Sequence, residues 1–214
     1  MASHEFRPST IASPRRSRRS RPPRPFWSTL RIVEILIVCG SVRATSLNAV
    51  MAQAAADLLP VGVAPLDFGP LDELPHFNPD VEETALPETA ARLRELVGRA
   101  AGIVLACPEY AHGASAIMKN ALEWLVGGTE LLGKPVALIS ASTAPTGGDR
   151  AQKWLRETLE VMDARVLDES VLVPTAGRTI VDGMLVDTLT RDDVARLMRA
   201  LVAAAEDLAL EQSA

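Results

Sequence analysis

The fold of this chain is decided at Cys39-Gly40-Ser41-Val42-Arg43-Ala44-Thr45-Ser46-Leu47-Asn48. Residues 32–38, in front of this stretch, are apolar and mostly β-branched except for Glu34, which is typical of a strand buried on both faces of a parallel sheet. Residues 49–59, behind it, are rich in helix formers and contain no breaker. A strand, a short polar loop and a helix start present backbone N–H groups at a positive helix end, where phosphate groups bind.

The polar side chains of this loop support two interpretations. Ser41, Thr45, Ser46 and Asn48 add donors to the backbone N–H groups, and Arg43 adds a charged fork that suits phosphate oxygens. The stretch is then a phosphate-binding loop. The alternative is an ordinary turn between strand and helix, in which Ser46 is only the helix N-cap. This stretch alone leaves both interpretations open.

Length and composition set the limits of the fold. A chain of 214 residues with 48% hydrophobic content predicts one domain with a full core. No apolar run approaches the roughly 18 uncharged residues that a membrane span needs. The two cysteines, Cys39 and Cys107, form neither a disulfide framework nor a metal-ligand spacing, and the three scattered histidines add no metal site. These features favour a cytoplasmic protein without a metal.

The first thirty residues differ from the rest of the chain. They hold seven arginines and one acid, Glu5, among many Ser and Pro residues, so the remaining chain is acidic. Because they contain too few apolar side chains to form a core, we predict a disordered tail at residues 1–30 and one folded domain at residues 31–214. Such a tail could contact nucleic acid or membrane phosphates, or act as a targeting sequence. We favour a tail without function or a start-site artefact, and neither nucleic-acid nor membrane binding.

Beyond the tail, apolar strand patterns alternate with amphipathic helix patterns. The expected strands are residues 32–38, 61–66, 102–107, 135–140 and 165–173, and the expected helices are 49–59, 88–100, 115–126, 149–162 and 191–210. Residues 69–87 contain four prolines and are expected to be a loop. This alternation predicts an α/β fold, a five-stranded parallel sheet between two layers of helices.

Polar loops follow three of these strands. In such sheets, ligands bind beyond the carboxyl ends of the strands. Besides residues 39–48, the loop 108–115 follows the third strand and the loop 140–149 follows the fourth. We therefore expect one site, built from three loops, at a single edge of the sheet.

Three motifs in these loops resemble one family. Residues 40–48 look like the phosphate loop of the NADPH-dependent FMN reductases, a flavodoxin-like family that includes quinone, azo and chromate reductases. Cys107-Pro108-Glu109-Tyr110-Ala111-His112-Gly113, followed by residues 119–124, resembles its second motif. Thr146-Gly147-Gly148-Asp149-Arg150-Ala151 resembles its third. The resemblance implies tightly bound FMN, a sheet of order 2-1-3-4-5, and a homodimer or homotetramer.

The resemblance also implies where FMN binds. The residues that it implies for the phosphate are Ser41, Arg43, Ser46, Asn48 and the backbone of Leu47. Those that border the isoalloxazine are Pro108, Glu109 and Tyr110, with His112 and Gly113 as further candidates; Ser142, Gly147 and Gly148 come from the third loop. The two glycines permit close approach and N–H donation to a ring carbonyl. We name no catalytic residue, because hydride transfer to flavin requires no protein acid or base.

The implied activity is hydride transfer from NADPH or NADH to FMN N5 and then to a quinone, free flavin or similar acceptor. Tyr110 is the only tyrosine, so a flavin flanked by two aromatic rings is not expected, and an open face suits an enzyme. The alternative is a non-enzymatic FMN-binding electron carrier or redox-responsive partner-binding protein. Lys119 and Asn120 are expected to be structural, and His112 to be positional. Cys39 and Cys107 end neighbouring strands, where their thiols could approach, although two buried hydrophobic side chains are expected.

We also expect the helix at residues 115–126 to form part of a subunit contact. Met118, Leu122, Trp124 and Leu125 spread its apolar surface over a wide arc. A helix with so wide an apolar arc is either deeply buried or at an interface.

Overall fold

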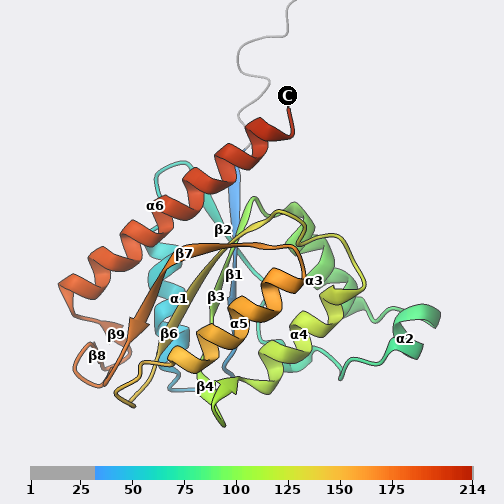
Figure 1. Cartoon of the computed structure of the whole chain (residues 1–214). Helices are drawn as coiled ribbons and strands as arrows, with labels where there is room; N and C mark the ends of the chain where they lie inside the picture. Colours follow the sequence, from blue (N-terminus) through green and yellow to red (C-terminus); the bar gives the residue numbers. More distant parts are fainter. Residues whose placement is uncertain (1–31, 214) are drawn as a thin grey trace, which may run out of the picture. The chain divides into compact units, whose positions relative to one another are not determined.

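A five-stranded parallel sheet forms the middle of the domain (Figure 1). The computed structural model describes residues 32–213, so the predictions made for residues 1–30 lie outside the described residues. The strands, in the order in which they lie side by side, are β2 (Val63–Asp67), β1 (Val33–Cys39), β3 (Gly102–Ala106), β6 (Pro135–Ala141) and β7 (Arg165–Val173). Counted along the chain, this is the predicted order 2-1-3-4-5, which is confirmed.

Helices cover both faces of the sheet, which gives the predicted three layers. The helices α1 (Leu47–Asp57) and α6 (Thr188–Glu211) pack on one face, and the helices α3 (Glu88–Arg99), α4 (Ala116–Val126) and α5 (Asp149–Val161) pack on the other. The central strands β3 and β6 are buried along their whole length, as the unbroken apolar runs predict. Each face therefore has its own apolar core.

The expected loop at residues 69–87 contains regular structure, so that prediction was wrong in part. A 3-10 turn, Leu71–Glu73, is followed by a short helix, α2 (Pro79–Thr84). The side chain of Asn78 accepts the backbone N–H of Asp80 at 2.9 Å, and Pro79 stands at the first helical position. Asparagine followed by proline is a standard helix start. The sequence contains this helix-start signal, but we expected a loop because of the other prolines in residues 69–87.

The helix α4 is buried within the chain. Met118, Leu122, Trp124 and Leu125 are all at most 6% exposed. The apolar arc from which we expected a subunit contact is thus covered by the chain's own sheet and by the segment before α2. The wide arc means deep burial here, so the reason for placing a subunit contact on this helix is lost.

The segment 75–77 is docked onto α4 by specific contacts. The Trp124 indole N–H donates to the carbonyl of Pro75 at 2.8 Å. The Trp124 and Phe77 rings pack edge-to-face, with their centroids 5.1 Å apart. Asn120 donates to the same carbonyl at 3.0 Å and accepts the N–H of Phe77 at 2.8 Å. Lys119 pairs with Glu123 on the helix surface. The contacts of Lys119 and Asn120 are therefore structural ones.

A single lysine closes the carboxyl end of α3. Lys134 Nζ donates to the carbonyls of Val97, Gly98 and Ala100 at 2.7, 3.1 and 2.6 Å. These carbonyls are left without partners in the helix, and the helix dipole favours a cation beside them. Burial lowers the pKa of this ammonium below its ordinary value, against which nearby Glu130 acts. The contact lies at the amino-terminal edge of β6, opposite the edge where the three polar loops lie.

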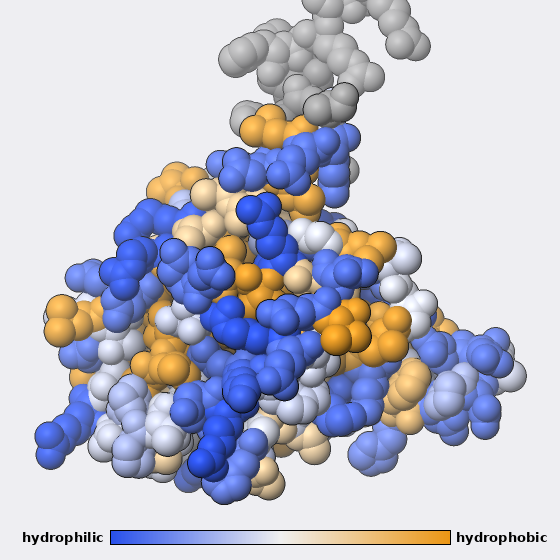
Figure 2. Space-filling model, in the orientation of Figure 1, coloured by the Kyte–Doolittle hydropathy of each residue, from blue (hydrophilic) through white to orange (hydrophobic). Residues whose placement is uncertain are grey.

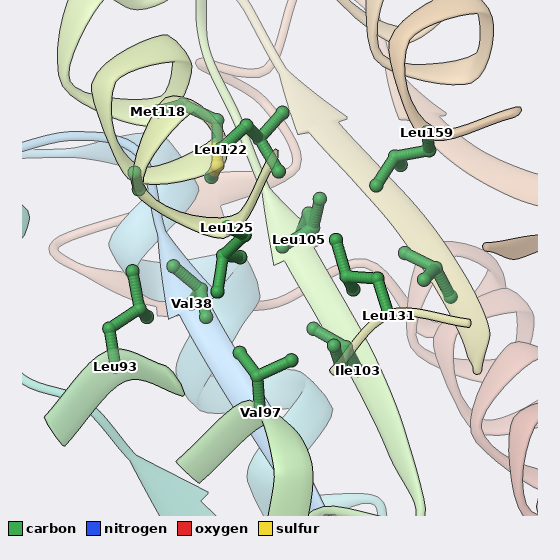
Figure 3. A pocket seen from close by; sticks show the side chains of 12 residues that line it. Val38, Leu93, Val97, Ile103, Leu105, Met118, Leu122, Leu125, Leu131 and Leu159 are labelled. Carbon is green, nitrogen blue, oxygen red and sulfur yellow. The ribbon is translucent and has the colours of Figure 1, made fainter. Parts of the chain in front are cut away.

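A small cavity lies under α3 and α4. It has a volume of about 20 Å³, and aliphatic side chains and one methionine line it, including Val38, Leu93, Ile103 and Leu122 (Figure 3). An apolar space of this size holds no hydrogen-bond partner for water and stays dry. It is a packing defect of the core, and it is far too small for a flavin.

Candidate functional site

The three polar loops meet at the carboxyl edge of the sheet. This rim lies at the lower side of Figure 1, where the loops after β1, β3 and β6 run from neighbouring strands. The same edge is mostly pale or blue in Figure 2, in keeping with its serine, threonine and glycine content. The rim thus offers polar groups beside a buried apolar sheet.

The first loop, residues 40–46, leads into α1 with most of its backbone N–H donors free. Arg43 donates its backbone N–H to Ser41 Oγ at 3.5 Å, and Ser46 Oγ accepts the N–H of Ala49 at 3.1 Å as the N-cap. The other backbone N–H groups of residues 41–48 have no acceptor within the described part of the chain. Arg43 is exposed. Ser46 is therefore the N-cap, and the loop still offers free N–H groups to an anion.

Asn48 is oriented differently from our expectation. Its side chain is 3% exposed, donates to the carbonyl of Ala141 at 2.9 Å and accepts the N–H of Ala141 at 3.0 Å. The amide thus joins the start of α1 to the end of β6. We therefore assign its side chain to the support of the loops and leave only its backbone N–H among the phosphate donors.

The second loop forms a small hairpin that sequence patterns did not predict. The strands β4 (Glu109–Tyr110) and β5 (Gly113–Ala114) are antiparallel and are joined by Ala111 and His112. Both joining residues have positive φ angles, 49° and 64°. Two-residue hairpin turns of this kind favour asparagine and glycine, and neither stands at these two positions, so the turn could not be predicted. Tyr110 and His112 are exposed at the rim, and Pro108 is buried beneath it.

Glu109 connects this hairpin to α5. One carboxylate oxygen accepts the backbone N–H of Arg150 at 3.2 Å, in the first turn of the helix. The other lies 3.5 Å from His112 Nδ1, and the guanidinium of Arg150 lies against the same ring nitrogen. Glu109 thus shares the N–H of Arg150 with Asp149 Oδ1, which accepts it at 2.9 Å, at the start of a helix whose N-cap, Gly148, has no side chain. Arg150 is a rim residue that sequence reasoning missed.

The third loop requires its two glycines. Gly147 and Gly148 have φ angles of 67° and 98°, which other residues rarely adopt. A Cβ atom on Gly148 would lie 2.8 Å from Ser140 Cβ, and one on Gly147 would lie 3.0 Å from the nitrogen of Pro174. Ser142 Oγ accepts the N–H of Ala144 at 3.1 Å and shapes the loop. The loop backbone therefore packs tightly on the sheet below it.

The two cysteines lie on opposite faces of the sheet. Cys107 belongs to the core under α4, and Cys39 packs against the core under α1. Successive residues of a strand point to opposite faces, and Cys39 is paired with Ala106, the residue before Cys107. The thiols do not meet. The described residues also contain no group of ligands that could hold a metal ion.

Both thiols are expected to be unreactive. Burial raises the pKa of Cys39, and burial raises the pKa of Cys107 from 9.0 to about 11. At pH 8 the thiolate fraction of Cys107 should be about a hundredfold below that of an ordinary thiol. In a Cys39→Ser variant, labelling with iodoacetamide should rise about tenfold with each pH unit towards 11. Labelling at pH 8 as fast as in urea would contradict this prediction.

The donors of the rim fit a flavin nucleotide. A phosphate dianion needs several N–H donors and a positive charge, which the first loop offers through its free N–H groups and Arg43. A flat ring system needs backbone that comes close, which the Gly147-Gly148 turn supplies. Glu109 belongs to the loop that lies between these two in the sequence. Its carboxylate contacts the start of α5 and lies beside His112.

Comparisons with known proteins agree with this geometry. The pattern of the NADPH-dependent FMN reductase family matches residues 33–178. An NAD(P)H-dependent FMN reductase of Pseudomonas aeruginosa is 30% identical over 173 residues, which cover 79% of this chain and 93% of that protein. A quinone reductase of Escherichia coli K12 is 30% identical over 140 residues, or 64% of this chain and 74% of that protein.

Solved structures show the same fold. The flavoenzyme FerB of Paracoccus denitrificans, an NAD(P)H:(acceptor) oxidoreductase, superposes with a TM-score of 0.74 at 23% identity and covers 82% of this chain and 98% of its own. A flavodoxin variant of Pseudomonas aeruginosa gives 0.53 at 13% identity, covering 81% and 99%. The fold and the relatives together define a flavodoxin-like oxidoreductase.

The chain belongs to the NADPH-dependent FMN reductase family. Its cofactor is FMN, and its reductant is a nicotinamide nucleotide. Among residues 32–213, no helix is long and apolar enough to cross a membrane.

Proposed function

We propose that this protein oxidises NADPH or NADH and passes the electrons to a quinone, free flavin or similar small acceptor. The observation that carries the proposal is the first loop, in which free backbone N–H groups and Arg43 stand at the start of α1. Bound FMN would supply the two-electron chemistry between nucleotide and acceptor. The quinone reductases among the relatives favour a quinone as acceptor.

The protein's own residues would bind and orient the flavin. The backbone N–H groups of residues 41–47 and the guanidinium of Arg43 would hold the phosphate. Tyr110, Gly113 and Gly147 would border the flavin ring. Glu109, held by α5 and His112, would keep the hairpin in place. Tyr110 is 53% exposed, so it leaves one side of the rim open for a nucleotide or an acceptor. We assign no proton transfer to a side chain.

Stopped-flow mixing tests this function. The purified protein with FMN should lose its flavin absorbance anaerobically with NADPH or NADH and regain it when a quinone is added. Reduction by either nucleotide should be faster than that of free FMN at the same concentration, because the rim orients both reactants. If neither nucleotide reduces bound flavin faster than free FMN, the enzyme proposal fails, and the electron-carrier alternative replaces it.

We further propose a cytoplasmic homodimer or homotetramer. The family resemblance supports the assembly, whereas α4 no longer points to the contact surface because its apolar side chains are buried. Two free cysteines with no disulfide between them suit a reducing compartment. Light scattering at micromolar concentration checks the assembly, and the mass of a single chain would contradict it.

A further inference from the structure

Buried polar side chains collect under the rim. In the described part of the chain, the polar residues buried to at least nine-tenths are Ser46, Asn48, Ser115, Ser140 and Gln152. Three of them, Asn48, Ser115 and Ser140, each connect one rim loop to another. A buried polar group is costly unless it is hydrogen-bonded, so the four connecting bonds that these three residues make hold the loops at fixed positions.

The three connections form a closed ring. Ser115 Oγ, after the second loop, donates to the carbonyl of Gly40 in the first loop at 2.6 Å. Ser140 Oγ, before the third loop, donates to the carbonyl of Cys107 before the second loop at 2.8 Å. Asn48, in the first turn of α1 after the first loop, makes both of its bonds to Ala141, the last residue of β6 before the third loop. Each loop is therefore connected to both of the others, through its own backbone or through a residue that flanks it.

The ring lies directly against the rim backbone. A Cβ atom on Gly40 would come within 3.0 Å of Ser115 Oγ, and one on Gly148 within 2.8 Å of Ser140 Cβ. Two of the three connecting side chains thus touch the backbone of the loops that would hold the phosphate and the ring. A shift of either serine would be transmitted to that backbone, because there is no free space between them.

We propose that Asn48, Ser115 and Ser140 are positioning residues that join the three loops into one preorganised FMN site. The inference rests on the proposed function only in that FMN binds at this rim. Loops that are held together before binding lose less conformational entropy when the ligand arrives, so affinity depends on the ring even though none of its side chains needs to touch FMN. Because the bonds form one network, the loss of one member should loosen all three loops.

Hydrogen exchange tests the ring without flavin. In the full-length protein, Ser140→Ala should speed amide exchange about tenfold at Ala49 and Val50, whose N–H groups are bonded to Ser46 at the end of the first loop and which Ser140 does not contact, as well as in the second and third loops. Ser115→Ala should likewise speed exchange in the third loop, residues 142–148. Faster exchange confined to the loops that each serine touches would overturn the proposal.

Flavin affinity tests the same ring by a double variant. Ser115→Ala and Ser140→Ala should each weaken FMN binding about tenfold, and the double variant only about twenty- to thirtyfold, because the first change already opens the ring. If the double variant loses about a hundredfold in FMN affinity, which is the product of the single effects, the two serines act independently and the proposal is overturned.

Lys134→Met is the matched control. It removes three hydrogen bonds at the opposite edge of the sheet, so it should lower the stability of the domain. It should change FMN affinity by no more than about twofold. Amide exchange in the three loops should stay unchanged when each protein is measured at the same interval below its own melting temperature. An equal loss of FMN in this control would assign the serine effects to stability alone and would overturn the proposal. If the unaltered protein binds no FMN, the proposed function fails, while the exchange experiment still decides on the ring.

Discussion

Replacing Arg43 with alanine should weaken FMN binding about ten- to a hundredfold and leave riboflavin binding almost unchanged. Arg43 is exposed beside a loop whose backbone N–H groups are free. A charge-assisted hydrogen bond contributes about 1.5–3 kcal/mol, and about 1.4 kcal/mol is a tenfold change in affinity. Riboflavin lacks the phosphate and therefore cannot use this contact. Fluorescence titration of the apoprotein with each flavin measures the ratio.

Salt and a matched variant sharpen this result. The loss should be greater at low ionic strength, because part of the attraction is Coulombic. Ser46→Ala should cost less FMN affinity and more stability, since its hydroxyl caps α1. Arg178→Ala, an exposed arginine outside the three loops, should change neither affinity. Equal weakening of FMN and riboflavin by Arg43→Ala would place the phosphate elsewhere.

Replacing Trp124 with alanine should lower the free energy of unfolding by about 3–5 kcal/mol. This indole is fully buried, meets Phe77 edge-to-face and donates to the carbonyl of Pro75. Its removal opens a cavity and leaves that carbonyl with one partner fewer. For a domain of this size the melting temperature should fall by roughly 6–20 °C. Urea unfolding followed by circular dichroism measures the loss.

Two further variants separate the contributions at this position. Trp124→Phe keeps an aromatic ring beside Phe77 but loses the N–H donor, so it should cost clearly less than alanine. Trp154→Ala removes an indole that is only partly buried and whose ring nitrogen makes no hydrogen bond within the described chain, so it should also cost less. A Trp124→Ala loss no greater than that of Trp154→Ala would show that segment 75–77 is not held by this side chain.

The sheet and its helices could be predicted because their signals are local. Strands such as β3 and β6 are unbroken apolar runs, and α5 has a clear amphipathic pattern. The rim could be predicted too, because polar loops after parallel strands lie at one edge. These inferences need only the order of residues along the chain.

The features that differ from what the sequence suggested depend on partners far along the chain. Asn48 was expected at the phosphate, but its amide bonds Ala141, which is 93 residues away. The apolar arc of α4 suggested a subunit contact, but Phe77 and Pro75 cover it from a segment that was expected to be an unstructured loop. The hairpin turn at Ala111 and His112 lacks the glycine or asparagine that such turns favour. Neither composition nor periodicity reveals such contacts.

The separation of the two thiols by the sheet bears on how the protein tolerates its own chemistry. Flavins also react with dioxygen, so an enzyme of this kind is exposed to oxidants that its own cofactor produces. Oxidation of cysteine proceeds through the thiolate, which the raised pKa of Cys39 and Cys107 keeps scarce. Placement on opposite faces prevents an internal disulfide. The catalyst should therefore survive many turnovers in air without losing its thiols.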